Sequence, residues 1–453
     1  MSDDLSNYPR EGDDLAPRPA TIEFGARPRT KLEHALLSSY WFANNFHWGA
    51  LLLILMPGDV NLLDPANRAT TLAKLTSLGA VFALVIPLWA AVISDRSMNR
   101  LGRRRPFLAI GTFVNVVGLL IMALAANGRS IPLYALGFMI VQLGNNLALG
   151  PYMGVMPDLV VPAERGLSSG FMALMSQLGT LLGAFGVGVA LGGQPAFVRY
   201  GLVAAVLVVG IVVGWRAIDE KPLRTPPPKM HWGRYIRSLW IDPKVHPDFF
   251  WVWVTRFLVM LGFYAVLPQV NYYLIDVVRI SPKEVEGKAT ILLGAILLLS
   301  SISGVYGGVL SDRIGRKRVV FLSNGLIAVF SLGFIFARDF WTALAVGAVF
   351  GLGYGAYISV DYALGNDVLP DKDEAGKDMA VWHIAMTLPQ VLAAPIAGEL
   401  IASGGKTLDP VNKLSNGDPL YHYGLGGYVG VFLLCSLCFA LGAVLLRNVR
   451  GVR

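Results

Sequence analysis

The sequence is poor in charged residues and nearly free of cysteine. Only 15% of its 453 residues are charged, whereas soluble domains carry about a quarter. Its two cysteines, Cys435 and Cys438, form one C-x-x-C pair inside an apolar run, and no second pair of ligands accompanies them. This pattern favours helix packing over metal binding or redox chemistry.

Long apolar runs take the place of the missing charges. Runs of 18 or more apolar residues are typical of transmembrane helices, and the chain contains about twelve. They lie at about 34–57, 71–94, 107–126, 131–156, 167–192, 197–216, 249–275, 287–310, 318–337, 340–365, 379–403 and 425–447. The sequence therefore predicts an all-α polytopic membrane protein with twelve transmembrane helices.

The polar segments predict the domain boundaries. Residues 1–33 are polar and rich in proline and acids, so we expect a disordered cytoplasmic tail and no cleavable signal. Residues 217–248 contain Pro226-Pro227-Pro228 and mixed charges, as linkers do. The linker separates six spans in residues 34–216 from six in residues 249–447, and residues 448–453 form a short tail.

The net charge of +8 is not spread evenly. Basic residues gather in alternate short loops, first at Arg96, Arg100, Arg103, Arg104 and Arg105, then at Arg313, Arg316, Lys317 and Arg318. This alternation is the positive-inside pattern, which places both termini in the cytoplasm. The arginines therefore indicate membrane topology, and we expect no nucleic-acid partner.

The two halves contain a sequence repeat. Ser94-Asp95-Arg96 recurs as Ser311-Asp312-Arg313, and a glycine with basic residues follows each copy. A second repeat relates Asp158, after the fourth span, to Asp367, after the tenth. Two parallel six-helix bundles related in this way are a recurrent transporter design, in which the bundles move around a site between them.

These motifs carry a resemblance to a known family. The loops after spans two and eight resemble the D-R-x-G-R-[RK] signature of the major facilitator superfamily. The longer first copy, from Ser94 to Phe107, is similar to the sucrose–proton symporters and the related glycoside–pentoside–hexuronide branch. Asn145-Asn146-Leu-Ala-Leu-Gly-Pro151 also resembles the sucrose carriers, and the segment from Gly376 to Gln390 resembles bacterial relatives. The resemblance implies two pseudo-symmetric bundles in a cell membrane, here a bacterial inner membrane.

The repeated loops are predicted to form the gate. Their candidate residues are Asp95, Arg96, Gly102 and Arg103 in the first half and Asp312, Arg313, Gly315 and Arg316 in the second. Aspartates at helix ends can accept hydrogen bonds from neighbouring helix N-termini and pair with arginines. The alternative is that the arginines only set topology and contact lipid.

Spaced glycines predict close helix packing. Pairs at G-x-x-x-G spacing occur at Gly179 and Gly183, Gly188 and Gly192, and Gly304 and Gly308, in spans five and eight. Small residues at this spacing let helices approach closely. We interpret them as a sliding seam between the halves, with static packing as the alternative.

Polar residues inside the spans predict a binding site for a neutral polyol. The candidates are Asn44, Asn45 and Trp48, with Trp41 and His47 beside them; Gln142, Asn145 and Asn146; Gln269 and Asn271; and Tyr354 and Tyr357. Amides can donate to and accept from hydroxyl groups, and aromatic faces can cover the apolar side of a sugar. The alternative is that single amides only bridge helices.

We expect the residue that couples transport to an ion to lie away from the position used by the sucrose carriers. The proton-coupled sucrose carriers have an aspartate where this chain has Gln142, which cannot titrate, and span two contains no acid before Asp95. We therefore assign proton coupling to Asp361, with His383, against the alternative of a structural pair. Glu399 is a further buried candidate, and we expect Arg256 to extend to the cytoplasmic surface.

The sequence thus predicts a secondary transporter that moves a small neutral sugar or glycoside across the lipid bilayer, coupled to protons. An uncoupled facilitator, an efflux carrier of amphipathic compounds and a sensor that does not transport are the alternatives. Gly166-Leu-Ser-Ser-Gly170 matches G-x-S-x-G, but it enters a helix without a preceding strand, so we expect no enzyme. We also expect no cofactor or metal.

Overall fold

The computed structural model describes residues 27–161, 164–223, 233, 241–370, 375–414 and 417–450. Within these residues, twelve helical segments are long and apolar enough to cross a membrane. The predicted fold class is therefore confirmed. The first span runs from Ser39 to Leu63, beyond the predicted end at 57, because polar Asp59 and Asn61 lie inside the helix and lower its hydropathy.

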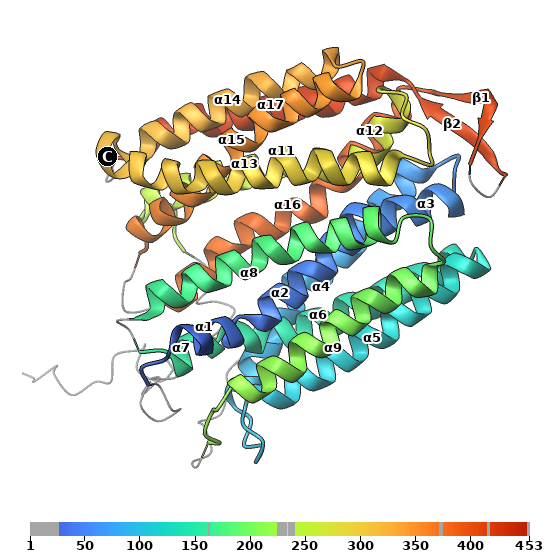
Figure 1. Cartoon of the computed structure of the whole chain (residues 1–453). Helices are drawn as coiled ribbons and strands as arrows, with labels where there is room; N and C mark the ends of the chain where they lie inside the picture. The colour runs from blue at the N-terminus through green and yellow to red at the C-terminus, as the bar shows by residue number, and fades with distance from the viewer. Residues whose placement is uncertain are drawn as a thin grey trace, which may run out of the picture.

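The first half contains spans one to six (Figure 1). A short helix α1 (Lys31–Leu37) precedes span one, which consists of α2 (Ser39–Ala50), a π-helical turn η2 (Leu51–Leu55) and α3 (Met56–Leu63). The other elements are α4 (Arg68–Asp95), α5 (Arg105–Gly128), α6 (Ile131–Met153), α7 (Val155–Leu159), α8 (Arg165–Phe185), η4 (Gly186–Ala190) and α9 (Ala196–Ala217).

The second half contains spans seven to twelve. Its elements are α11 (Pro247–Val266), η5 (Leu267–Gln269), α12 (Val270–Asp276), α13 (Val285–Ile314), α14 (Arg316–Phe336), α15 (Phe340–Asp367), α16 (Ala375–Ser403), α17 (Leu425–Leu445) and η6 (Leu446–Asn448). Side-chain caps start several helices. Asp339, for example, accepts hydrogen bonds from the backbone nitrogens of Trp341 and Thr342 at the start of α15.

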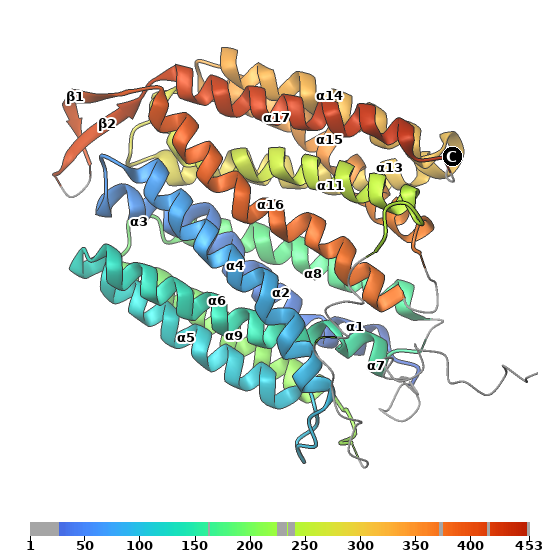
Figure 2. The same cartoon turned by 180° about the vertical axis from the view of Figure 1, so that it is seen from behind.

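Helix packing repeats between the halves. In the first half α2 packs on α8 and α9, α5 on α6 and α9, and α4 on α6. Six spans later, α11 packs on α16 and α17, α14 on α15 and α17, and α13 on α15. The halves meet where α4 packs on α16 and α8 on α13, as both views show (Figures 1 and 2). The fold is therefore two similar bundles joined along two helix pairs.

One element has no counterpart in the predicted all-helical chain. A two-stranded antiparallel hairpin, β1 (Lys406–Lys413) and β2 (Pro419–Tyr423), joins α16 to α17 and projects beyond the helices (Figure 2). We call this side of the molecule, with the loops at 64–67 and 277–284, the hairpin end. The opposite side, with the loops at 95–105 and 312–316, is the arginine end.

The glycine pairs pack differently from the predicted seam. An added Cβ at Gly179 or Gly183 would meet the backbone of Phe42 or Phe46 in the same half. At Gly304 it would approach Gly355, also in its own half, and at Gly308 it would meet nothing within 4 Å. Gly188 is the member that contacts the other half, beside Thr290. The glycines therefore serve mainly close packing within each bundle.

These contacts predict different costs for two equivalent substitutions. Gly183→Ala should destabilise the protein by about 1–3 kcal/mol, because the new methyl group would overlap backbone atoms of α2. Gly308→Ala adds the same methyl group into open space and is the matched control. The midpoint of thermal unfolding in detergent should fall for the first variant alone. Equal midpoints would contradict this account.

Candidate gates and binding site

The arginine end of the first half is held by a cluster of paired charges. Arg104 contacts the carboxylates of Asp95 at 2.6 Å and Asp158 at 2.9 Å. Arg103 lies 2.5 Å from Asp158 and 3.5 Å from Asp95. Two carboxylates from the ends of α4 and α7 thus surround two arginines at the start of α5, as the sequence predicts for Asp95. Arg96 is the C-cap residue that follows α4.

The helix N-terminus at this cluster is capped by a residue that the sequence analysis missed. Glu220 accepts hydrogen bonds from the backbone nitrogens of Arg104 and Arg105, at 2.8 and 3.0 Å. Burial raises the pKa of Glu220, although these amides and the nearby arginines oppose the rise. Gly102 has a φ of 101°, and a Cβ there would overlap the Glu220 side chain. The capping role predicted for Asp95 therefore belongs to Glu220.

The second half repeats part of this arrangement. Gly315 has a φ of 98°, close to that of Gly102, and it also precedes a helix that begins with arginine. Arg316 pairs with Asp367 and donates to the carbonyl oxygen of Ala363 at 2.7 Å. Asp367 thus matches Asp158, which gives the second sequence repeat a structural meaning. Arg313 is exposed, and the side chain of Asp312 lies outside the described residues.

At the hairpin end, a buried charge network joins the two halves. Arg68, at the start of α4, forms an ion pair with Asp276, at the end of α12. Asp276 also accepts a hydrogen bond from Tyr428 at 2.6 Å and lies 3.3 Å from the ring of His422. The other nitrogen of His422 lies 3.0 Å from Asp409 of the hairpin. The hairpin is therefore part of the closure at this end.

Backbone contacts strengthen the same closure. Asn271 donates to the carbonyl oxygen of Leu53 at 2.7 Å, and Tyr272 donates to that of Pro57 at 3.1 Å. Both acceptors belong to the first span, where Pro57 lacks the N–H that would otherwise bond to the carbonyl oxygen of Leu53. The structure thus places Asn271, predicted to bind substrate, at a contact between the halves.

The three polar candidates of α6 are buried, and Asn115 of α5 lies beside them. Asn146 donates to the carbonyl and side-chain oxygens of Gln142, at 2.8 and 3.0 Å. Asn115 of α5 reaches Asn145 at 3.5 Å. Among the described residues, Asn145 Nδ2, Asn115 Oδ1 and Asn44 Oδ1 have no hydrogen-bond partner. The cluster therefore keeps free donors and acceptors inside the membrane.

Span one carries the remaining candidates of the first half. Asn45 donates to the carbonyl oxygen of Trp41 at 2.8 Å. The rings of His47 and Trp48 meet edge to face, with centroids 4.5 Å apart. Both ring nitrogens of His47 are buried and lack a partner within the described part of the chain. Asn45 is thus satisfied locally, whereas His47 is not.

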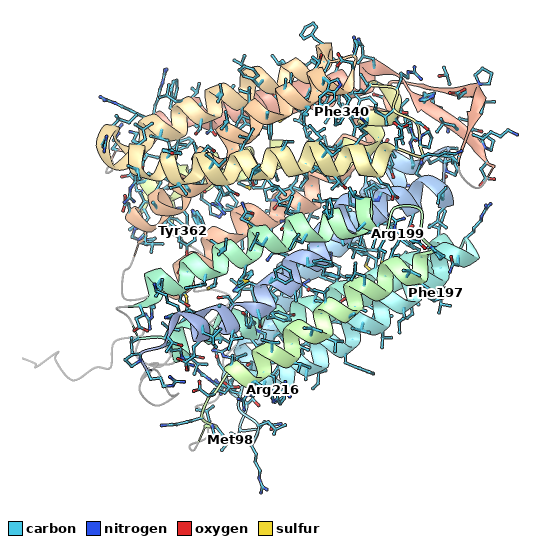
Figure 3. The ribbon with its side chains drawn as sticks, viewed as in Figure 1. Met98, Phe197, Arg199, Arg216, Phe340 and Tyr362 are labelled. Carbon is cyan, nitrogen blue, oxygen red and sulfur yellow. The ribbon has the colours of Figure 1, made fainter. Side chains whose placement is uncertain are left out.

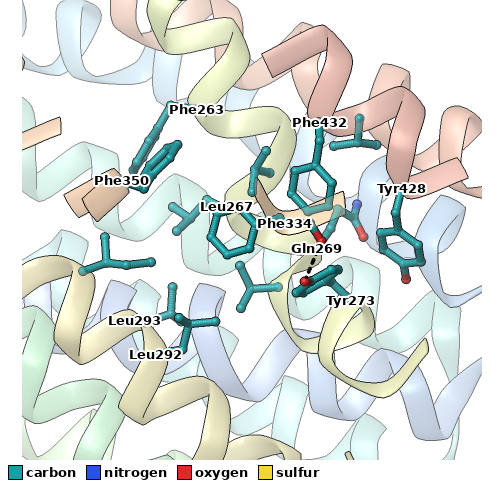
Figure 4. A pocket seen from close by; sticks show the side chains of 14 residues that line it. Phe263, Leu267, Gln269, Tyr273, Leu292, Leu293, Phe334, Phe350, Tyr428 and Phe432 are labelled. Atoms are coloured by element: carbon teal, nitrogen blue, oxygen red, sulfur yellow. Dashed lines mark hydrogen bonds between the residues drawn. The ribbon is translucent and has the colours of Figure 1, made fainter. Parts of the chain in front are cut away.

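Two candidates of the second half, Gln269 and Tyr354, lie at an apolar pocket (Figure 4). Gln269 lies in its wall, and neither side-chain atom has a partner among the described residues. The Tyr273 hydroxyl donates to the carbonyl oxygen of Phe334 at 2.9 Å across the pocket (Figure 4). Tyr354 stacks on Phe263, whose ring also lines the pocket, with centroids 4.1 Å apart. The pocket lies within the second bundle.

The prediction that Arg256 extends to the cytoplasmic surface is wrong. It is 4% exposed, pairs with Asp361 and lies over the ring of Trp382, 3.4 Å from its centroid. Extending the guanidinium to the surface would leave the buried Asp361 carboxylate unpaired, which favours Arg256 inside the bundle. Tyr357 is buried one helical turn before Asp361. Glu399 is exposed, and the side chain of His383 lies outside the described residues.

Comparison with known proteins places this architecture in a family. A model of the Major Facilitator Superfamily matches residues 35–307 and 257–451. The chain belongs to the major facilitator superfamily. The predicted resemblance is therefore confirmed at the level of the family, and the twelve helices and duplicated arginine loops are those of a superfamily transporter.

Individual relatives of this superfamily member are distant. Sucrose transport protein SUC3 of Arabidopsis thaliana is 25% identical over 30% of this chain and 26% of its own length. The chain thus spans about a quarter of that relative. Sucrose transport protein SUT5 of Oryza sativa subsp. indica is 23% identical over 87% of this chain and 85% of its own length.

A solved structure has the same fold. A mutant of the nucleoside transporter NupG is 12% identical and has a TM-score of 0.70, over 93% of this chain and 100% of that chain. At this identity the likeness extends to the fold alone. The sucrose transport proteins, by contrast, align in sequence, and both match the branch that the loop motifs resemble.

The cap formed by Glu220 gives a stability prediction for this transporter. Glu220→Ala should cost about 1–3 kcal/mol, because two buried amides at the start of α5 lose their acceptor. Glu220→Gln keeps one acceptor oxygen and should cost less. Lys221→Ala, an exposed neighbour, is the control. Thermal unfolding in detergent should rank the midpoints in that order, and an unchanged midpoint for Glu220→Ala would contradict the capping role.

Proposed function

We propose that this chain is a secondary transporter of a neutral sugar or glycoside that works by alternating access and is coupled to protons. The observation that carries this proposal is a set of buried amide atoms that have no hydrogen-bond partner among the described residues. They belong to the first half and are Asn44 Oδ1, Asn115 Oδ1 and Asn145 Nδ2. Leaving such atoms unpaired in a membrane interior is costly. Sugar hydroxyl groups, which both donate and accept, match them without requiring a charged partner.

The contacts at the hairpin end support alternating access. They join the halves through side chains, at Arg68 with Asp276 and at Asn271 with Leu53, rather than through a continuous helix. Such contacts can break as the bundles rock. We place the arginine end in the cytoplasm of a bacterial cell on the positive-inside rule. The described conformation is then closed toward the outside.

The named relatives support the substrate class. SUT5 of rice is described as a sucrose transport protein, and the alignment covers most of both chains. Our chain has no acid at the position of Gln142, so its coupling group must lie elsewhere. Asp361 remains our sequence-based candidate within the predicted site.

A second candidate function has an observation in its favour. The pocket in the second half is lined by the phenylalanines Phe263, Phe334, Phe350 and Phe432. An efflux carrier of amphipathic compounds would use such an apolar surface. The partnerless amide of Gln269 in the same wall favours a ligand with a polar group.

Transport of labelled sugars into proteoliposomes tests the function. We expect saturable uptake of a disaccharide or glycoside, stimulated by an inward proton gradient. Asn145→Ala should raise KM by roughly 5–10-fold, because about one hydrogen bond to the sugar is lost. Asn99→Ala, an amide in the exposed loop at the arginine end, is the control.

Other outcomes discriminate between the candidates. Sugar uptake that is independent of the proton gradient would indicate a facilitator. If no sugar is transported and amphipathic dyes are extruded, the sugar function is replaced by efflux. Equal KM values for Asn145→Ala and Asn99→Ala would remove Asn145 from the site.

The role of Asp361 needs a variant that avoids an unpaired arginine. Asp361→Asn alone leaves Arg256 buried without its carboxylate and should reduce folding as well as transport. In the double variant Arg256→Met with Asp361→Leu, both charges are absent. If Asp361 carries the proton, sugar uptake by the double variant should lose its dependence on pH. Proton-driven uptake that survives would assign the pair a structural role.

A further inference from the structure

A second buried acid lies at the hairpin end, outside the arginine loops and the amide cluster. Asp59, in α3, is 6% exposed. Its Oδ2 accepts hydrogen bonds from the hydroxyl groups of Tyr134 at 3.0 Å and Tyr200 at 2.7 Å. The two hydroxyl oxygens are themselves 2.9 Å apart. Both tyrosines lie near the first turns of their helices, α6 and α9, so three helices of the first half meet at this carboxylate.

An ion pair between the halves lies beside this acid. Arg199 precedes Tyr200 in α9, and its guanidinium lies 2.6 Å from the carboxylate of Glu286 near the start of α13. Figure 3 shows Arg199 at the hairpin end. A Cβ on Gly58 would lie only 2.6 Å from Oε1 of Glu286, so this carboxylate packs against the residue before Asp59. We call these five residues, Asp59, Tyr134, Arg199, Tyr200 and Glu286, the Asp59 cluster.

The Asp59 cluster has one more acid than it has bases. The charged groups that face Asp59 are Arg199, from its own half, and Glu286, from the other half; the tyrosines supply the remaining contacts. With both carboxylates ionised, the cluster carries a net charge of −1. Glu286 contacts the guanidinium directly, whereas the donors to Asp59 within the described part of the chain are the two tyrosine hydroxyl groups. One proton on Asp59 would bring the buried cluster to neutrality.

We propose that Asp59 is a proton-binding site whose occupancy allows the two halves to close at the hairpin end. When the halves separate, Glu286 moves away with the second half, while Arg199 remains in the first half with Asp59. Arg199 can then neutralise the ionised Asp59, and the proton leaves to water. Closing therefore takes up one proton from the solution at that end, and opening releases one.

This inference rests on alternating access as proposed above, but not on the identity of the solute. It also supplies a coupling group outside span four, where the chain has Gln142. Arg199 changes partner between two carboxylates, so its guanidinium stays paired throughout the exchange. Proton uptake and closure are then linked through a single guanidinium.

The test measures closure without any sugar. Spin labels on Gln194→Cys and Lys283→Cys, both at exposed positions on opposite halves, report the separation at the hairpin end by pulsed EPR in lipid nanodiscs. Cys435 and Cys438 are replaced by alanine. The closed-to-open ratio should fall as pH rises, by up to about tenfold per pH unit within the titration range, because one proton is linked to closure.

Substitutions assign this dependence to Asp59. Asp59→Asn resembles the protonated acid and should stay closed at every pH. Tyr200→Phe removes a donor to the ionised carboxylate, so the midpoint of the pH-dependent closure should move to higher pH. This variant also tests the proposal if Asp59→Asn does not fold. Glu284→Gln, an exposed acid at the same end, should keep the pH dependence of the unsubstituted cluster.

Two results would overturn the proposal: pH-independent distances in the protein with an intact Asp59 cluster, or an unchanged pH dependence in Asp59→Asn. Failure of the sugar function gives a different result. If no sugar is transported but the distances still follow pH through Asp59, the substrate assignment fails and the proton site stands. Proton-driven sugar uptake with label distances that do not change with pH would support the sugar function and overturn the proton site.

Discussion

A charge buried among apolar helices must find its partner within the protein, because hydrocarbon supplies neither donors nor acceptors. The arrangement of this transporter follows from that constraint. Several buried arginines among the described residues each contact a carboxylate on another element, and four of them, in α4, directly before α5, in α9 and in α11, illustrate this. They are Arg68, Arg104, Arg199 and Arg256. Each pair fixes two elements relative to each other, since separating the charges would strand both.

These pairs divide into two kinds with different mechanical consequences. Arg104 with Asp158 and Arg256 with Asp361 lie within one half and make each bundle rigid. Arg68 with Asp276 and Arg199 with Glu286 join the two halves at the hairpin end. A rocking motion preserves the first kind and must break the second. Groups that can replace a lost partner, such as Asp59 for Arg199, lower the cost of that break.

The arginine loops were the most predictable part of the candidate site. Their duplication is visible in the sequence, and Gly102 and Gly315 adopt nearly the same positive φ before a helix that carries the pairing arginines. Asp158 and Asp367 were recognised as a repeat, and each contacts an arginine. Glu220 was missed, although an acid directly after the sixth span was a usable signal. Asp59 was missed because the predicted first span ended at residue 57, which left this acid outside the helix.

The number of spans, their division into two halves and the repeated loops could be predicted without a structure. Those features depend on local hydropathy and on short motifs, which act over one helix length. Tertiary structure alone decided that Asn271 contacts Leu53 and that Arg256 meets Asp361. It also decided that the hairpin closes on Asp276 through His422. Partners more than a hundred residues apart are selected by helix packing, because a buried polar group pairs with whichever group the fold brings within reach.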